Sequence, residues 1–220
     1  MMSKKSKANQ VISETIEIAG KTLLSCIPIG GALITSIWDS IKSNCASKRM
    51  LHWRTELEQR LSHLEISLDE IGSNELFTTA LYQATESALK TSENQKREYL
   101  ANAVCNAAKC TLDESVLMMF IDMANRYTLW HIKILHFFDN PMKFKSVSSG
   151  GYSMGAPMTI LLDTFPELRS NEDLAKKIIK DLYTEGLLNT DNVNCTMTWS
   201  GMKASRTTKL GREFIAFLSE

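Results

Sequence analysis

The chain has 220 residues, of which 44% are hydrophobic and 23% are charged, and this globular composition excludes extensive disorder. Its 25 basic residues balance its 25 acidic residues, so no overall field draws the protein towards nucleic acid or an acidic membrane. The five cysteines are scattered and odd in number, which argues against a disulfide framework and predicts reduced thiols in a cytoplasmic protein.

The most apolar stretch of the chain is residues 23–38, near the N-terminus. It is shorter than the roughly 20 residues that a membrane-spanning helix needs, and Pro28, Gly30 and Gly31 interrupt it. We expect a helical hairpin with these three residues as its hinge, buried in a bundle. The alternative is a membrane-associating effector that uses residues 9–42, because a basic tail leads into an amphipathic helix there.

Apolar residues recur at helical spacing as far as residue 139. The expected helices cover residues 9–24, 32–66, 74–89, 92–107, 111–123 and 128–139. Two of the helix starts match the capping-box pattern, Ser92 with Gln95 and Thr111 with Glu114. The sequence therefore predicts a mainly α fold whose N-terminal part, residues 1–139, is a multi-helix bundle.

Residues 140–156 break this periodicity and collect Ser, Gly and Pro, a composition that predicts an exposed loop or linker. Beyond it, the pattern favours two helices, two short strands around Ser200-Gly201, and a closing helix. This order within residues 157–220 is typical of a small winged-helix-like (α+β) domain.

A winged-helix-like domain would place its second helix in the major groove of DNA. Seven basic side chains would then contact phosphates: Lys176, Lys177, Lys180, Lys203, Arg206, Lys209 and Arg212. Acidic residues in the same segment, among them Glu172, Asp173 and Asp181, leave it close to neutral. That balance favours packing on protein, or dimerisation, over DNA binding.

The sequence predicts no catalytic, metal or cofactor site. His131 and His136 share one expected helix at a spacing of five residues, whereas a metal-binding pair on a helix needs a spacing of about three or four. The Gly-rich stretch 149–153 lacks the patterns of a phosphate-binding loop and of a nucleophile elbow. We therefore expect a protein that is not an enzyme and that binds no cofactor.

Several segments together resemble a widespread family of poorly characterised bacterial helical proteins. They are an Ile-Pro and Gly-Gly turn at residues 27–31, a K-x3-LAN helix from Lys96, an LTxxHxxIL-like helix around His131, and the winged-helix-like end. In this chain Tyr127 stands where the commoner form of the third motif has Leu. The resemblance implies a helical module with a small C-terminal domain, an association with mobile or defence-type loci, and no established reaction.

These observations predict a cytoplasmic, non-enzymatic module for protein interaction or regulation, in a bacterial stress or phage-defence setting. We expect a protein partner or self-association. The two alternatives are a winged-helix regulator that binds DNA and an effector that associates with membranes through residues 9–42.

Overall fold

A computed structural model describes residues 44–62, 64, 74–109 and 112–219. The predicted hinge at Pro28, Gly30 and Gly31 and the predicted membrane-associating residues 9–42 lie outside the described residues. The described chain forms two compact units. The first unit comprises the described residues as far as Arg126, together with Leu218–Ser219, and the second comprises Tyr127–Phe217.

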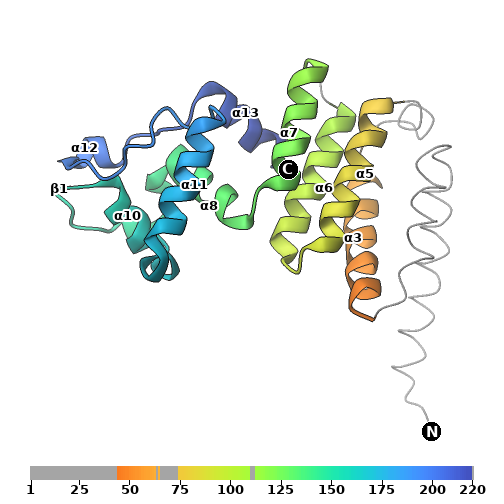
Figure 1. Cartoon of the computed structure of the whole chain (residues 1–220), viewed down its shortest axis with the longest axis horizontal. Coiled ribbons are helices and arrows are strands. Elements are labelled where there is room, and N and C mark those ends of the chain that lie inside the picture. Colours follow the sequence, from red (N-terminus) through yellow and green to blue (C-terminus); the bar gives the residue numbers. More distant parts are fainter. Residues whose placement is uncertain (1–43, 63, 65–73, 110–111, 220) are drawn as a thin grey trace, which may run out of the picture. The chain divides into compact units, whose positions relative to one another are not determined.

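The first unit contains four described helices that lie side by side (Figure 1). They are α3 (Asn44–Ser62), α5 (Glu75–Lys90), α6 (Asn94–Lys109) and α7 (Glu114–Arg126). Their core is formed by large side chains that are almost completely buried, including Trp53, Phe77 and Phe120. The prediction of a mainly helical fold is confirmed.

Polar side chains define where these helices begin. Asn74 accepts a hydrogen bond from the Phe77 backbone N–H at 2.9 Å and caps α5, as expected for an N-cap asparagine. Before α6, the hydroxyl of Thr91 accepts from the Glu93 backbone N–H at 3.1 Å, and α6 begins at Asn94, so the predicted start at Ser92 lies two residues too early.

The second unit consists mainly of short helices. In chain order its elements are α8 (Leu129–Asp139), η1 (Pro141–Lys143), α9 (Lys145–Ser148), β1 (Met154–Gly155), α10 (Pro157–Thr164), η2 (Pro166–Asn171), α11 (Glu172–Thr184), β2 (Met197–Thr198), α12 (Trp199–Met202) and α13 (Lys209–Phe217). Helix α8 packs against α11 and α13, and its buried residues, among them Ile132 and Leu135, supply part of the core. The amphipathic helix α11 ends before Gly186, whose φ of 74° suits glycine.

The small sheet of this unit differs from the predicted hairpin. Strand β1 pairs antiparallel with β2, with Met154 opposite Thr198. The predicted turn at Ser200-Gly201 is wrong, because both residues lie in α12, whose first turn is capped by the Thr198 hydroxyl. Of the predicted second strand, only Thr207 forms a bridge, and its partner is Leu188.

The stretch 140–156, predicted to be a loop or linker, contains regular structure. It holds η1, α9 and β1, and its residues Pro141 and Val147 are buried. The two units divide before Tyr127, whereas the sequence predicts a boundary at residue 139. Helix α8 belongs to the second unit because its apolar face packs on helices of that unit.

Candidate functional site

The three predicted DNA-contacting lysines of α11 all have acidic partners. Lys176 lies 3.4 Å from Asp173 and 3.7 Å from Glu172. Lys177 pairs with Asp181 on the same helix. Lys180 pairs at 2.7 Å with Asp191 in the segment after the helix, and this contact raises the pKa of Lys180. The solvent-facing side of α11 therefore presents ion pairs of mixed sign.

The remaining four basic residues do not gather into one patch with a shared role. Lys203 lies over the ring of Trp199, 5.7 Å from its centroid. Lys209 lies 3.5 Å from Glu213 on the same helix, and Arg212 donates to the Thr207 carbonyl at 2.8 Å.

Arg206 requires a correction, because its predicted role as an exposed phosphate contact is wrong. The residue is only 6% exposed. Its guanidinium donates to the carbonyl oxygens of Gly201 and Ala204, each at 2.7 Å. Three converging carbonyls, the third being that of Met202, satisfy a charge that burial would otherwise penalise. Arg206 therefore holds the α12 turn.

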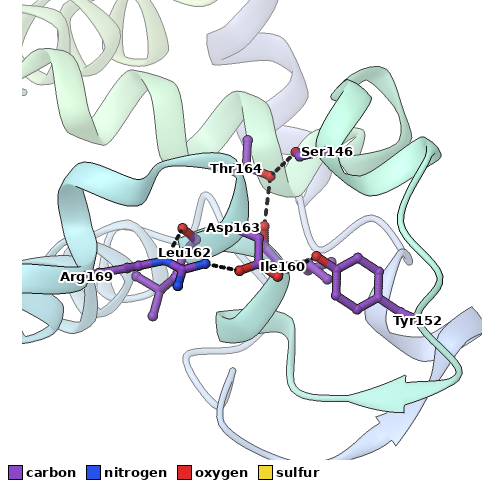
Figure 2. Close-up of polar contacts among 7 residues, drawn as sticks. All are labelled: Ser146, Tyr152, Ile160, Leu162, Asp163, Thr164 and Arg169. Carbon is purple, nitrogen blue, oxygen red and sulfur yellow. Dashed lines mark hydrogen bonds and ion pairs between the residues drawn. The ribbon is translucent and has the colours of Figure 1, made fainter.

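A polar cluster of the second unit centres on Asp163 of α10. Figure 2 shows Tyr152 and Arg169 approaching the Asp163 carboxylate from opposite sides. The Tyr152 hydroxyl donates to one carboxylate oxygen, and the Arg169 guanidinium donates to the other. Arg169 also donates to the Leu162 carbonyl at 3.2 Å. Charge-assisted hydrogen bonds of this kind are stronger than neutral ones, so the cluster fixes residue 152 to α10.

The same cluster determines the protonation of Tyr152. Partial burial and the Asp163 carboxylate raise the pKa of the phenol to about 12, since a negative charge next to the hydroxyl opposes its ionisation. The phenol is therefore protonated at neutral pH and acts as a hydrogen-bond donor. It lacks the lowered pKa that would activate a nucleophile.

A second contact ties α9 to α10. The Ser146 and Thr164 hydroxyls lie 2.8 Å apart, and the Thr164 hydroxyl donates to the Ile160 carbonyl at 2.7 Å (Figure 2). Together with the Asp163 cluster, this contact anchors the Ser/Gly-rich stretch at both ends. The segment that carries β1 is consequently braced by side chains from α10 and η2.

Aromatic stacking braces the segment from its other side. The rings of Tyr152 and Trp199 stack with centroids 5.6 Å apart and an interplanar angle of 22°. The Trp199 backbone N–H donates to the Ser153 carbonyl at 3.1 Å. We define the tip surface as Tyr152, Met154, Trp199 and Lys203. These residues lie in or next to β1, β2 and α12, which contact one another.

Met154 is the outstanding member of the tip surface. Its side chain is 65% exposed, more than any other large apolar residue in the part of the chain that the structure describes. In the sequence, Tyr152 and Met154 lie in a Ser/Gly-rich stretch without helical or strand periodicity, so the pattern does not predict their role. Two large side chains among Ser and Gly residues are the signal that could have identified this surface.

His131 lies in the first turn of α8. Its Nδ1 accepts a hydrogen bond from the Thr128 backbone N–H at 3.3 Å, and its Nε2 lies 3.5 Å from the Asp181 carboxylate. Within residues 44–62, 64, 74–109 and 112–219, no group of three or more His, Cys, Asp or Glu side chains is arranged to hold a metal ion. Among the helices in those ranges, none is both long and apolar enough to cross a membrane.

Comparisons of the chain with protein-family models, with curated proteins and with solved structures found no match.

Proposed function

We propose that this protein is a non-enzymatic protein-interaction module and that the tip surface is its contact site. The observation that carries the proposal is the 65% exposure of Met154 on a braced strand. A mobile loop can leave an apolar side chain in water at little structural cost, whereas the strand carrying Met154 is held by Asp163, Trp199 and β2. A fixed apolar group loses little conformational freedom on binding.

The chemistry of the tip surface indicates the kind of partner. Met and aromatic residues are enriched at the centres of protein interfaces. Lys203 places one positive charge beside Trp199. We therefore propose a partner protein that offers an apolar pocket for Met154 and a carboxylate near Lys203. We further propose a cytoplasmic bacterial setting in stress or phage defence, which rests on the resemblance drawn from the sequence motifs.

The fold of the second unit supports a winged-helix-like description as part of this proposal. Helices α8, α10 and α11 precede β2, and β1 lies between α8 and α10. In such an arrangement, α11 would be the recognition helix. The α12 turn and the two-residue strands depart from a regular wing.

DNA binding is the second candidate function, because the solvent-facing side of α11 carries Lys176, Lys177 and Lys180. Exposed ion pairs contribute little to stability, typically about 0–1 kcal/mol, so phosphates could displace the carboxylate partners. The acidic residues Asp173 and Asp181 would still face the DNA backbone. For this reason we place protein interaction first.

Site-specific photo-cross-linking tests the main proposal. A photoreactive amino acid is placed at position 154 or, as a control, at position 142 in full-length protein produced in its native host. Met142 is 39% exposed and lies in η1 of the same unit. We expect position 154 to give a discrete cross-linked protein band that position 142 does not give. Identical cross-linking patterns at both positions would overturn the proposal.

A further inference from the structure

The first unit holds a short segment of the chain by its main-chain carbonyls. The Asn102 side-chain amide donates to the Leu218 carbonyl at 3.0 Å, and the Asn106 amide donates to the Ser219 carbonyl at 2.8 Å. The two asparagines lie one turn apart on α6, on the same helix face. They contact successive carbonyl oxygens of residues that lie more than 100 positions later in the chain.

We propose that α3 and α6 form a peptide-binding groove where they contact residues 218–219. Residues 218–219, the resident segment, fill the groove in this structure, and a peptide of the same kind from a partner protein can take their place. The ligand class is an extended peptide with an aliphatic residue followed by a small polar residue. This inference goes beyond the proposed function, because it concerns the first unit and none of the tip-surface residues.

The hydrogen-bonding part of the groove is held in place by contacts between side chains of α3 and α6. Arg60 of α3 donates from Nε to the Asn102 side-chain oxygen at 2.7 Å, and Glu56 pairs with the Arg60 guanidinium. The bond from Arg60 orients the Asn102 amide so that its N–H group faces the Leu218 carbonyl. Asn102 itself is only 8% exposed. A buried amide held on one side by a guanidinium is a preorganised donor for a peptide carbonyl.

Leu218 provides the apolar part of the contact. Leu218 is 1% exposed, so its aliphatic side chain is enclosed at the point where Asn102 binds the main chain. Hydrogen bonds to carbonyls tolerate many sequences, whereas a closed apolar site selects side-chain size. We therefore expect the apolar site around Leu218, and not the hydrogen bonds to the main chain, to select an aliphatic residue at this position.

A cavity lies beside the resident segment. This cavity of about 450 Å³ borders Ser219 and is lined, among the described residues, by Glu56, Gln59, Arg60, Leu64, Asn102, Cys105, Asn106, Lys109 and Ser219. Its volume lies within the range of about 300–1,000 Å³ that is common for ligand sites. Among the described residues of this lining, Glu56 pairs with Arg60, and Lys109 adds a second cation. An acidic residue after the small polar one is therefore favoured in the bound peptide.

A direct binding experiment tests the inference. A fluorescein-labelled peptide with the sequence of residues 214–220 is titrated with full-length wild-type protein and with a Leu218→Asp variant, and binding is followed by fluorescence anisotropy. The buried charge in Leu218→Asp releases the resident segment. We expect the peptide to bind this variant at least tenfold more tightly than the wild type. A peptide with Asp in place of its own Leu should not bind.

Two further variants keep the test decisive. A truncated variant that ends after Phe217 lacks the resident segment and adds no buried charge. This variant is used in place of Leu218→Asp if Leu218→Asp does not fold. Adding Asn102→Leu and Asn106→Leu to the emptied protein should weaken peptide binding at least tenfold. Equal binding to wild-type and emptied proteins, no binding to either, or binding unaffected by loss of the asparagines would overturn the inference. Because Met154 plays no part in the groove, a Met154→Asp variant should bind the peptide as its parent does.

Discussion

Tyr152 donates a hydrogen bond to Asp163, and this contact connects the Gly-rich stretch 149–153 to helix α10. Gly150 and Gly151 allow this stretch many conformations, and the contact with Asp163, the stacking on Trp199 and the pairing of β1 with β2 together select one. Arg169 holds the other oxygen of the same carboxylate. The exposed Met154 is therefore presented on a defined strand.

Tyr152→Phe should destabilise the second unit. The substitution keeps the stacking on Trp199 and removes only the hydrogen bond to the Asp163 carboxylate, a kind of bond that contributes about 1.5–3 kcal/mol. Because Tyr152 is partly exposed, we expect a loss of about 1–2 kcal/mol in the free energy of unfolding, measured with urea. Tyr82→Phe is the control, since Tyr82 is 46% exposed and should change stability by less than about 0.5 kcal/mol. Equal effects of the two substitutions would show that the Asp163 contact does not brace the strand.

Lys96 should make the first unit more stable as the pH rises above 8. Burial lowers the pKa of Lys96 to about 8 in the folded protein, where its Nζ donates to the Ala124 carbonyl. The unfolded chain, with a pKa near 10.5, binds more protons between these values, so the free energy of unfolding increases with pH across that window. The increase is about 3 kcal/mol at most.

Comparison with Lys96→Met isolates this effect. Burial raises the pKa of the Cys105 thiol to about 11, which lowers stability as the pH rises, but this contribution is present in both proteins. Urea unfolding between pH 7.5 and 10.5 should therefore show the wild type gaining stability relative to Lys96→Met. Parallel pH curves for the two proteins would contradict the assignment.

Arg206→Ala should cost stability and should not act through DNA. The substitution removes the guanidinium that donates to the Gly201, Met202 and Ala204 carbonyls, and we expect a loss of about 2–4 kcal/mol. Lys209→Ala is the matched control, because the Lys209 side chain is 87% exposed. If both variants unfold at the same urea concentration, Arg206 does not hold the turn.

The DNA-binding alternative makes a separate prediction about salt. If α11 contacts phosphates, retention of duplex DNA should fall steeply with added salt, and Lys176→Glu combined with Lys177→Glu should abolish it. The proposed function predicts instead that the wild-type protein shows no retention at physiological salt in an electrophoretic mobility assay. Strong, salt-dependent retention that is lost in the double variant would make DNA binding the primary function.

Much of the helical part could be predicted from the sequence, because long amphipathic patterns determine which face is buried. Phe77, Leu81 and Ala84 of α5 recur at helical spacing and are all almost completely buried. By its sequence, either Ser73 or Asn74 could cap this helix, and Asn74 does so by accepting a hydrogen bond from the Phe77 backbone N–H.

The candidate site could not be predicted in the same way. Strands β1 and β2 have two residues each and lie more than 40 positions apart, so no periodic signal marks their pairing. The sequence also presents Arg206 as one more surface cation, because convergence of the Gly201, Met202 and Ala204 carbonyls arises only when the α12 turn forms. A pattern of residue types indicates local structure, whereas these contacts depend on the folded backbone.

The measurement that tests the central claim most directly is affinity capture with the full-length protein in its native host. Extracts are treated with nuclease, and the proteins retained by the wild type, Met154→Asp and Met142→Asp are quantified by mass spectrometry. The tip-surface proposal predicts at least one protein that the wild type and Met142→Asp retain equally and that Met154→Asp loses by tenfold or more. Retention of the same proteins in the same amounts by all three would contradict it.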